Sequence, residues 1–118
     1  MILIFFCALQ PNDNLVKSAV NKAKQLKMDV QLSDIQYNNV KNVYITETMK
    51  IDSLKYLPQD IVKDPKRMRA MINEIKANTN DIISKILTSS QVQKLKLIKE
   101  KRKHEALQKI NITSKPQH

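Results

Sequence analysis

Residues that could carry out catalysis or hold a metal are scarce in this chain of 118 residues. It has one cysteine, Cys7, and two histidines, His104 and His118. A metal site of the usual kind needs three or four His, Cys or carboxylate ligands at workable spacing, and His104 beside Glu105, far from His118, does not supply them. The chain contains no glycine, so it lacks a glycine-rich phosphate loop. We therefore predict that the protein is not an enzyme and uses no metal or cofactor.

A mixture of cations and apolar side chains gives the chain a binding chemistry instead. The formal net charge is +10, which favours acidic partners. Asp64 and Pro65 form a helix-start signal, and from there to Ile86 methionine and isoleucine recur at helical spacing with Arg and Lys at the rims. Such a surface attracts acidic unfolded segments at long range and then holds their apolar groups weakly, because methionine adapts to many shapes. The residues predicted to bind such client proteins are Arg67, Met68, Arg69, Met71, Ile72 and Lys76. The alternative is a buried seam with solvated cations at its margins.

Two copies of one helix-start motif must position this surface, at residues 32–36 (LSDIQ) and 87–91 (LTSSQ). In each copy a hydroxyl side chain caps the first turn, and the Gln three positions later reaches back to the backbone N–H of the cap. The leucine before the cap pairs with the apolar residue that follows the Gln and fixes the angle at which the helix begins. The predicted structural residues are Leu32, Ser33, Gln36, Leu87, Thr88 and Gln91. The two helices that they open should be related in space.

Apolar periodicity predicts an all-α protein with four long helices, over about residues 14–27, 34–56, 65–86 and 89–110, with a connection at 57–63 that has room for a single turn. Aromatic residues make up only 4% of the chain, so the core must be aliphatic and thin, and we expect a homodimer. A thin helical layer also offers little depth for a catalytic pocket.

Glu47 interrupts an apolar stripe, either at an exposed gap or as a charge partner of a neighbouring helix. In the helix predicted over residues 89–110, the cations from Lys94 to Lys103 point in nearly every direction around the axis. This helix should therefore project from the body.

The ends of the chain differ from its middle. Residues 1–9 (MILIFFCAL) are uncharged and too short to cross a bilayer. We interpret residues 1–10 as the remnant of an export signal; the alternative is an apolar segment packed on the core. Residues 11–112 are predicted to form a single helical domain, and residues 113–118 a disordered tail.

Paired L-[ST]-x-x-Q motifs, each opening a long helix in a small, basic chain without glycine, resemble the Spy/CpxP family, also called the LTxxQ-motif family. The copy at 87–91 matches the pattern fully, and the copy at 32–36 has Ser in place of Thr. The resemblance spans roughly residues 28–103. It implies an elongated four-helix protomer, paired antiparallel into a thin, cradle-like dimer in the periplasm. Family members include ATP-independent chaperones, inhibitors of sensor kinases and zinc-binding proteins. The incomplete signal departs from the family pattern, and the scarcity of His and Cys argues against the zinc-binding branch.

The expected function is therefore that of an ATP-independent periplasmic holding chaperone or envelope stress protein that binds unfolded or misfolded clients. One alternative is a regulatory partner of the periplasmic domain of a membrane sensor kinase. Another is a small nucleic-acid-binding protein that uses Lys94 to Lys103, for which binding would weaken steeply with salt. The few aromatic residues and the export-like start argue against nucleic acid. Without an export signal the protein would be cytoplasmic.

Overall fold

The computed structural model describes residues 13–114, which are almost entirely helical and include no β-strand. The elements are α2 (Asp13–Val30), α3 (Asp34–Ser53), the 3-10 helix η1 (Leu54–Tyr56), α4 (Gln59–Val62), α5 (Pro65–Ile86) and α6 (Ser89–Ser114). The predicted all-α class is confirmed. The predicted signal remnant at residues 1–10 and the last part of the predicted tail, residues 115–118, lie outside the described part of the chain.

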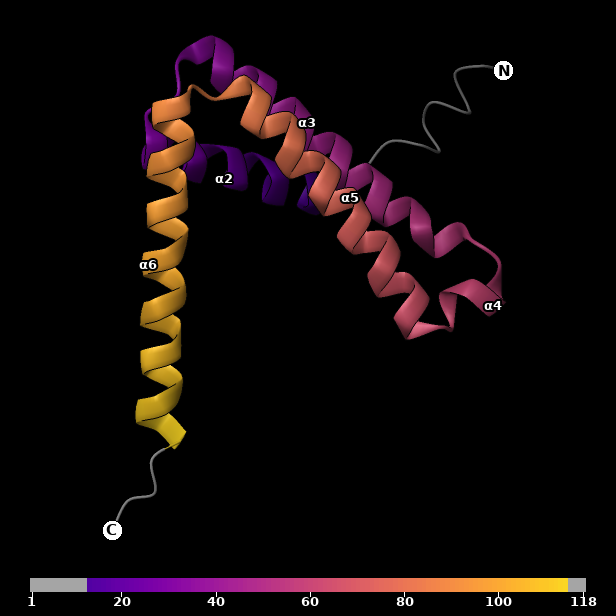
Figure 1. Ribbon diagram of the computed structural model, residues 1–118. Coiled ribbons are helices and arrows are strands. Elements are labelled where there is room, and N and C mark those ends of the chain that lie inside the picture. Colours follow the sequence, from indigo (N-terminus) through magenta and orange to yellow (C-terminus); the bar gives the residue numbers. More distant parts are fainter. Residues whose placement is uncertain (1–12, 115–118) are drawn as a thin grey trace.

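The described helices form two arms that meet at one corner (Figure 1). α3 and α5 lie side by side and antiparallel in the first arm, and η1 and α4 close its far end. α2 packs against α3 and also contacts α6. α6 is the second arm: it leaves the corner where α5 ends and runs away from the other helices (Figure 1). Every described side chain of α6 from Lys99 to Ile110 is exposed, as expected of a helix that projects from the body.

The helix boundaries follow local signals. α5 begins where predicted, with Pro65 in its first turn and the Asp64 carboxylate accepting a hydrogen bond from the Arg67 backbone N–H at 3.3 Å. The helix predicted to continue to Tyr56 tightens into η1 after Ser53, as happens near a helix end that precedes a proline, here Pro58. α4 is one short turn of helix inside the predicted connection.

Two boundaries differ from the prediction at the termini of the described part. α2 already includes Asp13, one residue before its predicted start. α6 runs past Ile110, where its predicted helix ends, to Ser114. The physical reason is that nothing in this stretch stops a helix: the first residue of a helix-breaking type after α6 begins is Pro116.

The connection between α2 and α3 is unusually tight for a chain without glycine. Gln31 adopts a left-handed backbone conformation, with φ 57°, directly after the last residue of α2. The Leu32 backbone N–H then donates to the Lys27 carbonyl at 3.3 Å, which satisfies one of the free carbonyls at the helix end. A left-handed conformation costs a residue with a Cβ roughly 1–2 kcal/mol. This connection therefore carries strain that a glycine would relieve.

The core is small and aliphatic, as the low aromatic content predicted. Val40 is the largest side chain that is completely buried among the described residues. The buried apolar residues are Ala19, Ala23, Leu26, Val30, Leu32, Val40, Leu54, Ile83 and Leu87. Most of them form one cluster where α2, α3 and the end of α5 meet. The arms beyond this cluster contribute few buried side chains.

Candidate client-binding surface and the helix junction

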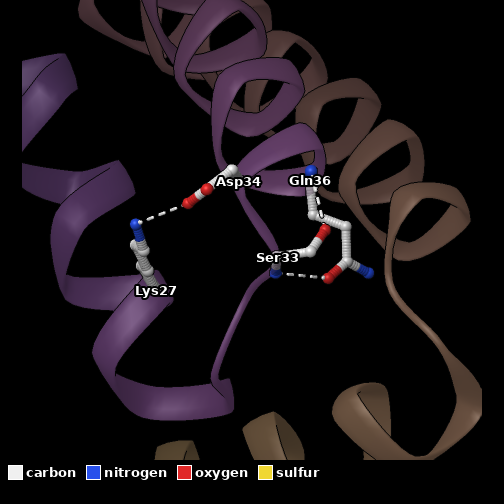
Figure 2. Close-up of polar contacts among 4 residues, drawn as sticks. All are labelled: Lys27, Ser33, Asp34 and Gln36. Carbon is white, nitrogen blue, oxygen red and sulfur yellow. Dashed lines mark hydrogen bonds and ion pairs between the residues drawn. The ribbon is translucent and has the colours of Figure 1, made fainter.

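The first capping box is formed at the start of α3 (Figure 2). The Ser33 hydroxyl accepts a hydrogen bond from the Gln36 backbone N–H at 3.2 Å, and the Gln36 side-chain oxygen accepts one from the Ser33 N–H at 3.0 Å. Beside the box, the Lys27 ammonium approaches the Asp34 carboxylate at 3.3 Å and joins the end of α2 to the start of α3 (Figure 2). Leu32, in front of the cap, is buried. These contacts fix the direction in which α3 leaves the turn.

The second box repeats this geometry at the start of α6. The Thr88 hydroxyl accepts from the Gln91 N–H at 3.2 Å, and the Gln91 side-chain oxygen accepts from the Thr88 N–H at 2.9 Å. Leu87 is buried, and Val92 packs against the same core cluster. The turn between α5 and α6 is thus held in the same way as the turn between α2 and α3.

The two boxes bind directly to each other through their glutamines. The Gln36 amide nitrogen donates to the Gln91 side-chain oxygen at 2.8 Å, and the Gln91 amide nitrogen donates to the Gln36 oxygen at 3.1 Å. Each glutamine also reaches the end of the helix before the other box. Gln36 donates to the Ile86 carbonyl at 3.2 Å, and Gln91 donates to the carbonyls of Val30 and Gln31, each at 3.3 Å. Two helix starts and two helix ends therefore share one hydrogen-bond network, which we call the glutamine junction.

The predicted client-binding residues lie along α5 and divide by exposure. The exposed side chains are those of Arg67, Arg69 and Lys76, and the half-buried ones are those of Met68, Met71 and Ile72. The buried residues of α5 are Thr79 and Ile83, and both lie in the second half of the helix. The apolar stripe of the first half of α5 is therefore partly open to solvent, with exposed arginines beside it. Unlike the other five, Lys76 also lines a cleft at the corner of the molecule.

This junction cleft lies where α2, α3, α5 and α6 meet, and its volume is about 290 Å³. Its charged lining consists of Lys22, Asp29, Glu47, Lys76, Lys99 and Arg102. Its lining contains no histidine or cysteine, and no cluster of three or more His, Cys, Asp or Glu able to hold a metal occurs among the described residues.

Arg102 joins α6 to α2 across the cleft. Its two terminal nitrogens donate to the two Asp29 carboxylate oxygens at 3.0 and 2.8 Å, in the paired geometry that suits arginine and carboxylate. The Asp29 side chain is only 11% exposed, and Gln25 donates a further hydrogen bond to it at 2.9 Å. Burial alone would raise the pKa of Asp29, but the hydrogen bonds from Arg102 and Gln25 outweigh burial and hold that pKa below its usual value.

A second ion pair joins α2 to α3. Glu47 is only 5% exposed, and its carboxylate lies 3.4 Å from the Lys22 ammonium. Of the two explanations predicted for Glu47, the charge partner on a neighbouring helix is confirmed. Lys22 also lies over the Tyr44 ring, 5.6 Å from its centre. Burial, together with the nearby Glu47 carboxylate, raises the pKa of the Tyr44 hydroxyl.

Sequence reasoning did not find the junction cleft or the pair between Arg102 and Asp29. These two residues are 73 positions apart, and no local motif relates them.

Within residues 13–114, no helix combines the length and the apolar character that crossing a bilayer requires. No protein-family model, curated protein or solved structure matches this chain significantly.

Proposed function

We propose that this protein is an ATP-independent holding chaperone that binds unfolded or misfolded proteins through the first half of α5. The observation that carries the proposal is the partial exposure of Met68, Met71 and Ile72 beside the exposed Arg67 and Arg69. A seam built only for stability would bury these apolar side chains, since each one left in water loses part of its transfer free energy.

The physical logic joins a fast electrostatic step to a weak apolar one. Cations raise the rate at which acidic segments arrive, and this effect falls as salt screens the charges. The flexible methionine side chains then contact many apolar shapes without selecting one. Weak contacts of this kind let a client fold while it is still bound.

We extend the proposal to a homodimer in the bacterial periplasm, of the elongated, cradle-like kind that the resemblance to the Spy/CpxP family implies. The small core supports dimerisation, because a second copy would bury further apolar surface. The uncharged residues 1–9 support export. Light scattering on the purified protein tests the dimer, and detection of the protein in periplasmic extracts tests its location.

Suppression of aggregation tests the chaperone activity itself. The purified protein should keep an unfolding substrate soluble without nucleotide, and high salt should weaken early capture. Replacing both Arg69 and Met71, as Arg69→Gln with Met71→Ser, should reduce the protection. The matched control is Lys66→Gln with Met28→Ser, which removes an exposed cation of α5 and an exposed methionine of α2 outside the stripe. Equal protection by the two variants would contradict the proposed surface, and no protection by the wild type would contradict the function.

A second candidate function is nucleic-acid binding by α6. It is favoured by the exposure of every side chain of the cationic helix from Lys99 to Ile110. Such binding should weaken steeply with salt as counterions are released. Titration of single-stranded and double-stranded DNA at two salt concentrations tests it, and the absence of binding at low salt would remove this candidate.

A further inference from the structure

The junction cleft holds more positive charge than its own carboxylates neutralise. Lys22 is paired with Glu47, and Arg102 is paired with Asp29. The other two cations of the lining, Lys76 and Lys99, form no ion pair in the described part of the chain. The cleft therefore has an excess of two positive charges, and both unpaired ammonium groups are free to bind a ligand.

The lining of the same cleft is also partly apolar. Leu26 of α2 and Leu95 of α6 line it together with the Tyr44 ring. Leu26 is buried, and the other two side chains are half-buried. The volume of about 290 Å³ equals the liquid volume of about ten water molecules. It is at the lower end of the range for small-molecule pockets, so it suits a short apolar group and not a large one.

Two lysines and an apolar wall select a particular ligand chemistry. A lysine ammonium has three donors and no acceptor, so it requires a partner that accepts hydrogen bonds and carries negative charge. Carboxylates and phosphates meet both needs, and lysine binds them as a point charge. A cationic ligand would meet repulsion from Lys76 and Lys99, since the two carboxylates of the cleft are already paired.

We propose that the junction cleft binds a small anionic amphiphile, with its carboxylate or phosphate between Lys76 and Lys99 and its short apolar body against Leu26 and Leu95. This site is distinct from the chaperone surface on the first half of α5 and does not depend on it, although Lys76 borders both. Because Lys76 belongs to α5 and Lys99 to α6, the bound anion joins the two arms of the molecule.

Hexanoate and hexyl phosphate are suitable probes, because each combines one anionic group with a short chain. Titrations followed by amide and methyl NMR should show saturable shifts at Leu26 and Leu95. Hexylamine should not bind, because its charge is reversed, and inorganic phosphate should bind more weakly, because it lacks the apolar body. Binding of hexylamine as strong as that of hexanoate, or no saturable binding of either anion, would overturn the proposal.

Variants of the two lysines separate the cleft from general attraction to a basic protein. Lys76→Ala and Lys99→Ala should each weaken hexanoate binding about fivefold, the effect of removing one exposed charge contact. The matched controls are Lys66→Ala in α5 and Lys101→Ala in α6, which remove exposed cations outside the cleft. If the controls weaken binding as much as the cleft variants, the anion is held by net charge and the proposal is wrong.

Vesicles of anionic phospholipid distinguish a membrane headgroup from a free amphiphile as the source of the anion. Vesicle binding that is lost in Lys76→Ala and Lys99→Ala would assign a lipid headgroup to the cleft. Binding of hexyl phosphate without binding of vesicles would assign a free amphiphile. Aggregation suppression, measured on Lys99→Ala, reports on the chaperone function separately, because Lys99 lies outside the predicted client-binding residues.

Discussion

Removing one glutamine of the glutamine junction should destabilise the whole molecule far more than its half-buried position suggests. In Gln91→Ala the lost side chain accepted hydrogen bonds from the Thr88 N–H and from Gln36. It also donated to Gln36 and to the carbonyls of Val30 and Gln31. The substitution therefore removes the reciprocal half of the capping box of α6, leaves the end of α2 without its partner and breaks the contact between the two boxes, while the Thr88 hydroxyl still accepts from the backbone N–H of residue 91.

The magnitude follows from these five contacts. The two donations at 3.3 Å come from one amide nitrogen to adjacent carbonyls, so we treat them as one hydrogen bond. Four bonds at about 0.5–1 kcal/mol each give a loss of about 2–4 kcal/mol in the free energy of unfolding. Alanine has a higher helix propensity than glutamine, which restores a few tenths of a kcal/mol. The net loss in the free energy of unfolding is then about 3 kcal/mol. At about 4 °C per kcal/mol for a domain of this size, Tm should fall by about 12 °C.

The assay is a double-mutant cycle of Gln91→Ala, Gln36→Ala and the double variant, followed by urea unfolding monitored by circular dichroism. Because the two glutamines bond each other twice, the double variant should lose about 1–2 kcal/mol less than the sum of the single losses. Gln93→Ala is the matched control, since Gln93 is an exposed glutamine of the same helix. A coupling below about 0.3 kcal/mol, within the range of independent sites, would refute the direct contact between the boxes. A loss in Gln93→Ala as large as in Gln91→Ala would refute the special role of the junction.

Three further predictions concern single residues around the same corner. Gln31→Gly should stabilise the protein by about 1 kcal/mol in urea unfolding, because glycine accepts the left-handed conformation without strain; a loss of stability would show that Gln31 is not strained. Folding favours the neutral form of the Tyr44 hydroxyl. The stability that this preference contributes is fully present below the unfolded pKa of 10.0 and is lost as the pH rises through the higher folded pKa. Glu47→Gln should lower the pKa of Tyr44 in a spectroscopic titration, and an unchanged pKa would leave burial as its only cause. The depressed pKa of Asp29 contributes stability above the unfolded value of 3.8, which is lost as the pH falls through the lower folded value; Arg102→Gln should raise that pKa in an NMR titration, and no rise would argue against the ion pair in solution.

Local signals predicted most of the helical structure because each acts within a few residues. A capping box needs only the cap and the Gln three positions later, and both boxes are formed as their sequences indicate. The start of α5 follows equally from Asp64 and Pro65. The sequence also indicated that the two motif-bearing helix starts are related, but not that Gln36 and Gln91 touch. That contact depends on how α2, α3, α5 and α6 are arranged, and helical periodicity does not contain this information.

The candidate sites were predicted less completely for the same reason. The stripe on α5 is visible in the sequence because it lies on one helix. The cleft is assembled from four helices, and its ion pairs join residues 25 and 73 positions apart. In the sequence Lys76 is one more rim cation of α5, and only its place in the lining of the same cleft as Lys99 gives it a second role. Charge counting along the chain predicts that cations are present, and the fold decides which of them remain unpaired.

The concentration of buried contacts at the corner explains how a chain with so small a core keeps two open arms, and one matched pair of leucines tests this explanation. Leu87 is 7% exposed at the junction, whereas Leu107 is 51% exposed on the free part of α6. Leu87→Ala should cost about 2–5 kcal/mol, as for other buried leucines, and Leu107→Ala should change the free energy of unfolding by less than about 0.5 kcal/mol. Urea unfolding at low protein concentration, where association contributes least, measures both changes in the free energy of unfolding. If Leu107→Ala proves as destabilising as Leu87→Ala, the far part of α6 is packed against something in solution, and a second copy of the chain becomes the first surface to examine.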